Sequence, residues 1–141
     1  MSVTGTAHPG GHQSDRADVE LRLPADSAYA SVLRTTAAGL AARLDFTIDD
    51  IEDLRIAVGE ANAMVLPEAD PGSDLTCRFY LAPGTLTIAV SVASLGAAAP
   101  DRDSFAWQVL TTLATSATAE SVDDQFVVTL TMHSSIAGVG L

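Results

Sequence analysis

The sequence predicts an α+β fold, a two-layer sandwich in which one mixed β-sheet carries its helices on a single face. Segments of alternating apolar and polar residues, typical of half-buried strands, come in pairs separated by short turns, as expected for hairpins. The segments with helical periodicity are few and clustered, so they can cover one face of the sheet. The predicted order of elements is β-α-α-β-β-α-β-β.

The chain is predicted to begin with one strand and one helix. Val19–Leu23 alternates apolar with charged residues, as a half-buried strand does, and Pro24 ends it. Asp26 or Ser27 can cap a helix that runs to about Leu44. The apolar positions of this helix include Tyr29, Val32, Leu33, Leu40 and Leu44.

A second helix is predicted after Thr47, because Thr47 and Asp50 are spaced as in a capping box. Acidic residues fill its first two turns, where the positive end of the helix dipole favours them. Its apolar residues recur at intervals of three and four, which gives one buried stripe, and Pro67 ends it. The stripe consists of Ile51, Leu54, Val58, Ala61 and Val65.

The second half of the chain predicts two hairpins joined by a third helix. Strands at 75–82 and 86–92 flank a turn at Pro83-Gly84. A loop from about Ser94 leads to a helix capped by Asp103 or Ser104, and strands at 116–121 and 126–132 turn at Asp123-Asp124. The apolar positions of the third helix are Phe105, Val109, Leu110 and Leu113.

The length of 141 residues fits one domain with a sizeable core. We place this domain at residues 18–134, between an N-terminal tail at 1–17 that we expect to be disordered and a loose C-terminal tail at 135–141. His8 and His12 lie four residues apart in the N-terminal tail. No further ligand accompanies them there, so no metal site is predicted.

The net charge of −11 and the absence of lysine argue against binding to nucleic acid, which needs clustered positive charge. An acidic surface suits a basic protein partner, and it also serves solubility alone. No run of about 18 apolar residues and no secretory start are present, and Cys77 is the only cysteine. We therefore expect a cytoplasmic protein that does not enter a membrane.

Residues 53–61, DLRIAVGEA, resemble the second-helix signature of RsbW-type anti-sigma factors, a branch of the GHKL (histidine kinase-like ATPase) superfamily. The order of elements from Val19 to Met132 is also similar to that family's order. The resemblance implies a GHKL fold and a regulator of transcription in a stress response, which sequesters an alternative sigma factor and is released by an anti-anti-sigma factor with a STAS domain. It also implies a possible homodimer, with Arg34 at a partner surface and Glu60 as the catalytic base at a Mg-ATP pocket.

Three boxes that hold nucleotide in this family are eroded here, as in a divergent actinobacterial subgroup that the chain resembles. Met64 stands where the family has a magnesium-binding Asn, and a thioether is a poor ligand for Mg²⁺. In the second box, Val92 stands where an Asp accepts a hydrogen bond from adenine, Ser94 replaces the first glycine, and only Gly96 survives.

The third box has Ser104 and Ala106 in place of two glycines, so a Cβ hinders the approach of a phosphate. The loop between Gly96 and Ser104 is also too short for the lid that closes over ATP. Loss of the adenine contact alone predicts binding weaker by about tenfold to a hundredfold. We therefore expect no required cofactor, although Mg-ATP or Mg-ADP remains possible.

These observations predict a protein that binds and sequesters an alternative sigma factor without needing ATP. The predicted contact residues are Arg34, Asp49, Asp50 and Asp53, of which the acidic ones could steer a basic sigma domain. One alternative is an ATP-dependent serine/threonine protein kinase that phosphorylates an anti-anti-sigma factor, with Glu60 as the base. Another is a scaffold that dimerises through the edge of the sheet.

Overall fold

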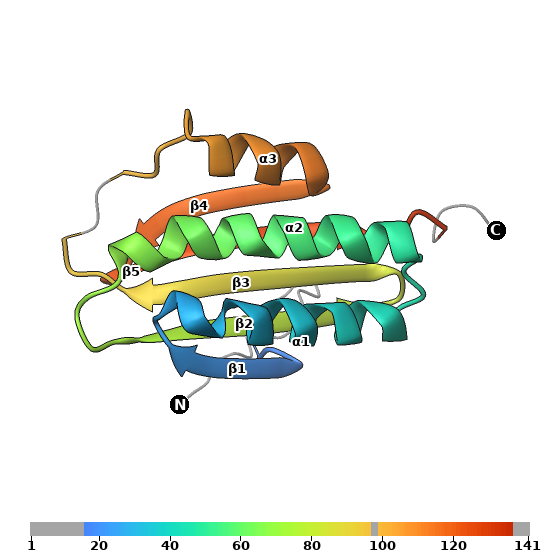
Figure 1. The fold of residues 1–141 in the computed structure, drawn as a ribbon, viewed down its shortest axis with the longest axis horizontal. Helices are drawn as coiled ribbons and strands as arrows, with labels where there is room; N and C mark the ends of the chain where they lie inside the picture. The colour runs from blue at the N-terminus through green and yellow to red at the C-terminus, as the bar shows by residue number, and fades with distance from the viewer. Residues whose placement is uncertain (1–15, 97–98, 137–141) are drawn as a thin grey trace, which may run out of the picture.

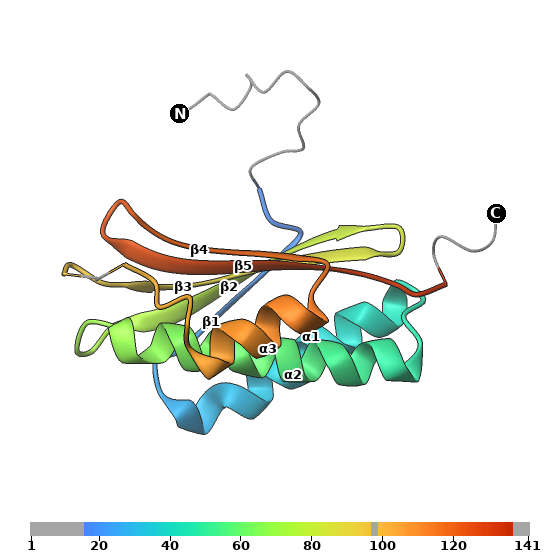
Figure 2. The ribbon, with the colours of Figure 1, turned by 90° about the horizontal axis from the view of Figure 1, so that it is seen from above.

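Within the part of the chain that the structure describes, five strands pair into one sheet in the order β1-β2-β3-β5-β4, and three α-helices cover one face of it (Figures 1 and 2). This computed structural model describes residues 16–96 and 99–136. His8, His12 and most of the predicted N-terminal tail lie outside the described residues, as do residues 137–141. The prediction of a two-layer α+β sandwich with helices on one face is confirmed.

The order of elements also agrees with the prediction. A 3₁₀ turn at Ser27–Tyr29 (η2) precedes α1, and another at Leu66–Glu68 (η3) follows α2. The strands are β1 (Val19–Pro24), β2 (Asp74–Ala82), β3 (Thr85–Ala93), β4 (Ser116–Val122) and β5 (Gln125–His133). The helices are α1 (Ala30–Arg43), α2 (Ile48–Val65) and α3 (Phe105–Leu113).

The sheet is antiparallel at every pairing of neighbouring strands, so the prediction of a mixed sheet is wrong. The reason is the position of β5. The chain passes from β3 through α3 to β4, and this crossover leaves β3 and β4 parallel to each other. However, β5 lies between them and pairs antiparallel with both, so the two parallel strands never become neighbours.

Helix α2 lies between α1 and α3 and packs on β3 and β5, at the centre of the helical layer (Figure 2). Leu54, Val58 and Val65 of its predicted stripe are fully buried, and the alternation of the strands points Ile88, Val90 and Val128 toward the helices. The core is therefore aliphatic. Within the described residues, no helix is long and apolar enough to cross a membrane.

Helix α1 buries smaller residues than the sequence predicts. Tyr29 and Val32, taken as apolar core positions, remain 40% and 42% exposed. The buried residues of α1 are Leu33, Ala37 and Ala41. Because alanine has a short side chain, this face allows α1 to approach the rest of the core closely. Phe105 is a similar correction in α3, since it is 77% exposed while Leu110 is buried.

The predicted capping box of α2 is confirmed. The hydroxyl of Thr47 accepts the N–H of Asp50 at 3.1 Å, and the Asp50 carboxylate accepts the N–H of Thr47 at 3.0 Å. The same carboxylate oxygen accepts the N–H and the hydroxyl of Ser135, each at 3.0 Å. Burial raises the pKa of Asp50, but the hydrogen bonds from Ser135 and Thr47 outweigh it and hold this pKa below 3.8.

Candidate functional site

Three residues from the eroded boxes meet at one cavity, although they lie far apart in the sequence. Met64 reaches it from α2, and Ser104 and Ala106 reach it from the start of α3. The cavity measures about 210 Å³, below the roughly 300–1,000 Å³ of typical ligand pockets. It lies at the end of the helical layer where α2 ends and α3 begins (Figure 1).

The chemistry of this cavity does not fit Mg-ATP. The charged residues that line it are Glu68 and Asp101, both acidic, and the remaining lining is mostly apolar. Acidic side chains repel a triphosphate, and no basic residue lines the cavity to offset them. The thioether of Met64 adds no oxygen ligand for a magnesium ion. Across the described residues, no group of three His, Cys, Asp or Glu side chains could hold a metal ion.

Arg102 follows Asp101, which lines the cavity, but the guanidinium of Arg102 makes its contacts elsewhere. It donates a hydrogen bond to the carbonyl of Ala119 at 3.0 Å and lies 5.2 Å from the centre of the Trp107 ring. The hydrogen bond ties the segment before α3 to β4, and the cation–π contact joins the same arginine to α3. The sequence gives no signal for this arrangement, because Ala119 contributes only its backbone oxygen.

The second eroded box does not join the cavity. Val92 is buried within β3, between Leu75 of β2 and Phe126 of β5. Ser94 is also buried, and its N–H donates to the carbonyl of Asp124 at 2.9 Å. Gly96 does not line the cavity, and a Cβ added to it would meet no atom within 4 Å. The geometry therefore gives no structural reason for glycine at this position.

Glu60 is also separate from the cavity. It lines a shallow groove between α1 and α2, together with Arg34, Glu52 and Arg55. Its side chain is partly exposed and has no hydrogen bond or ion pair with another described residue. Glu60 therefore does not line the cavity with Met64 and Ser104, although it lies one helical turn before Met64, and its role as a base stays a prediction.

Arg34 crosses from α1 to α2 at Gly59. A Cβ added to Gly59 would lie 3.7 Å from Cδ of Arg34 and 3.9 Å from its Nη1. These are ordinary contact distances, so the arginine stem packs over the backbone of α2 at the glycine. This contact leaves the guanidinium on the surface of the shallow groove, beside Glu52 and Glu60.

The predicted acidic contacts differ in how free they are. Asp49 and Asp53 are exposed on α2, whereas the Asp50 carboxylate is occupied by Thr47 and Ser135. A carboxylate that already accepts three hydrogen bonds at one oxygen is poorly placed to bind a partner. Asp49 and Asp53 therefore remain the better candidates from this acidic segment.

Asp70, which is not among the residues predicted from the sequence, organises the loop after β3. Both of its carboxylate oxygens lie 3.2 Å from the N–H of Leu95, and its own N–H donates to Ala93 at 2.8 Å. The only sequence signal is its place before the turn at Pro71-Gly72. Its partners lie more than twenty residues away, so only the folded chain reveals them.

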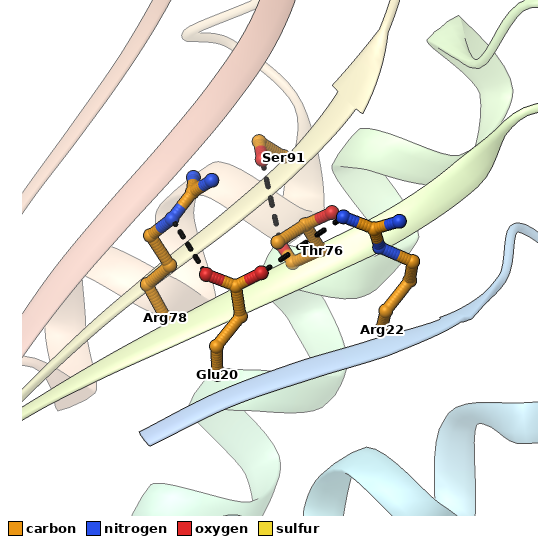
Figure 3. A network of polar contacts seen from close by, with 5 residues as sticks. All are labelled: Glu20, Arg22, Thr76, Arg78 and Ser91. Carbon is orange, nitrogen blue, oxygen red and sulfur yellow. Dashed lines mark hydrogen bonds and ion pairs between the residues drawn. The ribbon is translucent and has the colours of Figure 1, made fainter. Parts of the chain in front are cut away.

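The open face of the sheet carries a polar network across β1, β2 and β3 (Figure 3). Glu20 faces Arg78 across the β1–β2 pairing at 3.3 Å and lies 4.0 Å from Arg22. On the neighbouring strand, the hydroxyl of Ser91 donates to the carbonyl of Thr76 at 3.4 Å. Glu20 thus offsets the positive charge of Arg22 and Arg78 on this face.

Comparison with known proteins relates the chain to one group. No family model matches it. It is 40% identical over 74 residues to the serine-protein kinase RsbW of Halalkalibacterium halodurans, covering 52% of this chain and 46% of that protein. It is 34% identical over 76 residues to the serine-protein kinase RsbW of Bacillus subtilis, covering 52% of this chain and 48% of that protein.

The chain is thus similar to RsbW serine-protein kinases over about half of its own length. Its fold agrees with a crystal structure of the RsbU and RsbW domains of a Mycobacterium tuberculosis protein, with a TM-score of 0.59 at 15% identity. That match covers 82% of this chain and 32% of the Mycobacterium tuberculosis chain. The predicted GHKL fold is thereby confirmed. The chain spans about half the length of the two RsbW kinases above.

Proposed function

We propose that this RsbW-type chain binds and sequesters an alternative sigma factor without needing nucleotide. The observation that carries the proposal is the cavity at Met64, Ser104 and Ala106, where three residues of the expected nucleotide boxes meet but the walls are acidic and apolar. A fold that is retained while its nucleotide contacts are lost favours binding of a protein over catalysis.

The charge of the chain supports a protein partner with basic surface. The net charge is −11, and Asp49 and Asp53 are exposed on α2. Opposite charges on a partner would speed the encounter and favour one orientation of docking. Arg34, held against Gly59, is the proposed contact on the α1 side. A sigma factor, which itself binds DNA, has the basic character that this surface requires.

The direct test is titration of the purified full chain with candidate sigma factors from the same genome, with and without Mg-ATP. We expect one sigma factor to bind with the same affinity in both conditions. Failure of every sigma factor to bind would contradict the proposal. Binding that appears only with Mg-ATP would contradict its nucleotide-independent part.

The similarity to RsbW serine-protein kinases favours the alternative of kinase activity on an anti-anti-sigma factor. The test is incubation with radiolabelled Mg-ATP and a STAS-domain protein from the same genome, with a Glu60→Gln variant as the control. We expect no phosphoserine. Label that appears with the native chain and is lost in the variant would establish the kinase and Glu60 as its base.

The proposal implies a cytoplasmic protein, because the sigma factor acts there. It also leaves a place for an anti-anti-sigma factor, which would release the sigma factor by competing for this chain. A homodimer remains part of the proposal, and light scattering on the purified chain tests it. A mass of one chain at every concentration would remove the dimer.

A further inference from the structure

An apolar groove runs along the outer side of the helical layer, between α2 and α3, and differs from the Met64 cavity. Its volume is about 420 Å³, and its lining is mainly apolar. Phe105 is 77% exposed and Ile56 is 49% exposed. Figure 1 shows α3 lying alongside the middle of α2. The lining consists of Ile56, Phe105, Gln108, Val109, Thr112 and Leu113.

Acidic side chains follow this groove on its α2 side. Asp49 lies seven residues before Ile56, and Asp53 lies three residues before it. Glu60 lies four residues after Ile56. At these spacings, all three share the face of α2 that carries Ile56. Asp49 and Asp53 are exposed, and Glu60 is partly exposed. None of the three carboxylates has a hydrogen bond or ion pair with another residue in the part of the chain that the structure describes. The groove thus combines an apolar floor with an unpaired acidic rim.

We infer that this groove receives a helix of a partner protein that is apolar on one face and carries lysine or arginine along its flanks. The apolar stripe of such a helix would cover Ile56, Phe105 and Val109, as helices do in other hydrophobic grooves. Its basic flanks would pair with the acidic rim. At 1.5 Å per residue, the nine residues of α3 give a groove wall long enough for about two to three helical turns.

The acidic charge of the chain favours a basic partner helix in this groove over a second copy of the chain. A chain with a net charge of −11 would bring like charges together if two copies met at this rim. The groove between α1 and α2 offers different chemistry, because Arg34 and Arg55 stand there beside Glu52 and Glu60. The inference rests on the proposed function in one respect, since a sigma factor would supply the helix.

The test is titration of the full-length, ¹⁵N-labelled chain with a designed peptide of leucine, lysine and arginine, followed by nuclear magnetic resonance. The peptide has about 15 residues, near the length at which isolated helices become stable. A second peptide has the same composition in an order that spreads the leucines around the helix. We expect saturable binding of the first peptide, shifts centred on Ile56, Phe105 and Val109, and binding of the second that is weaker by about tenfold or more.

Two matched pairs of variants separate the apolar floor from the acidic rim. Phe105→Ser should weaken binding by about tenfold or more, whereas Leu95→Ser, at another exposed apolar residue, should change it by less than about twofold. Asp53→Asn should weaken binding and reduce its dependence on salt. Glu120→Gln, at an exposed acid on β4, should leave both unchanged.

The inference is overturned by equal affinity for the two peptides, by shifts centred on another surface, or by no binding at millimolar peptide. It is also overturned if the two serine variants have equal effects. Its failure can be told from that of the proposed function. If a sigma factor binds the native chain and the Phe105→Ser variant equally well, the inferred role of the groove is wrong and the proposed function stands. If no sigma factor binds but the first peptide occupies the groove, the proposed function is wrong and the groove stands.

Discussion

One carboxylate oxygen of Asp50, at the start of α2, accepts both the N–H and the hydroxyl of Ser135, 85 residues later in the chain. The same side chain completes the capping box with Thr47. Asp50 thus joins a local helix cap to the end of the last strand. This double role makes it a critical residue for stability.

Replacement of Asp50 by alanine should lower the free energy of unfolding by about 1–3 kcal/mol, because the cap and the bonds to Ser135 are lost together. Chemical denaturation measures this, with the exposed Asp53→Ala as the control. Since the folded pKa lies below 3.8, the stabilisation is present above about pH 3.8 and is lost as the pH falls through the lower folded value. Equal stability of the two variants would show that neither the side-chain cap nor the Ser135 contact contributes to stability.

Two glycines should respond to alanine in opposite directions. Gly39 is exposed within α1 and a Cβ there meets nothing within 4 Å, so Gly39→Ala should stabilise the protein by about 0.5–1 kcal/mol. Gly72 has a φ of 76°, a backbone angle that residues other than glycine rarely adopt. Gly72→Ala should therefore destabilise by about 1 kcal/mol. Thermal unfolding of both variants measures the pair, and changes of the same sign would contradict the helical and left-handed assignments.

Cys77 should be unreactive in the folded protein. Its thiol is buried in β2, and burial raises its pKa to about 12. A chromogenic disulfide reagent at pH 8 should modify it only in denaturant. The pKa of the unfolded thiol is 9.0, so the unfolded chain loses this proton at a lower pH than the folded protein does. The stability of the folded state therefore falls as the pH rises from 9.0 toward about 12. Rapid modification of native protein at pH 8 would show that β2 opens without global unfolding.

Leu110 and Phe105 should differ sharply in their contribution to stability, although both are large apolar residues of α3. Leu110 is fully buried, so Leu110→Ala should cost about 2–5 kcal/mol. Phe105 is 77% exposed, so Phe105→Ala should change stability by less than about 0.5 kcal/mol. Denaturant titration of the two variants measures the contrast. A large loss for Phe105→Ala would show that it packs into the core and does not face the groove.

The sequence was sufficient for the order of the helices and strands. Thr47 and Asp50 predicted the start of α2 because a capping box is formed by residues three apart. Alternation of apolar residues likewise predicted β1, β2, β3 and β5. The positions of Met64, Ser104 and Ala106 predicted an eroded pocket, and the structure places all three at one cavity.

Other features depended on contacts between distant residues. Glu60 and Met64 lie one helical turn apart on α2, yet only Met64 lines the cavity, because the position of the cavity depends on where α3 packs against α2. The sequence predicts Tyr29 and Val32 in the hydrophobic core, because large apolar residues are usually buried. In the fold, Ala37 and Ala41 face the core instead.

By itself, the sequence determined the elements, the fold class and the acidic charge, because capping, turn formation and amphipathic periodicity act within a few residues. Only the tertiary structure decided the insertion of β5 between β3 and β4, the bond from Asp50 to Ser135 and the groove beside Phe105. Each of these joins segments whose mutual position depends on the packing of the whole core. No short pattern of residues encodes such a position, since many arrangements bury the same side chains.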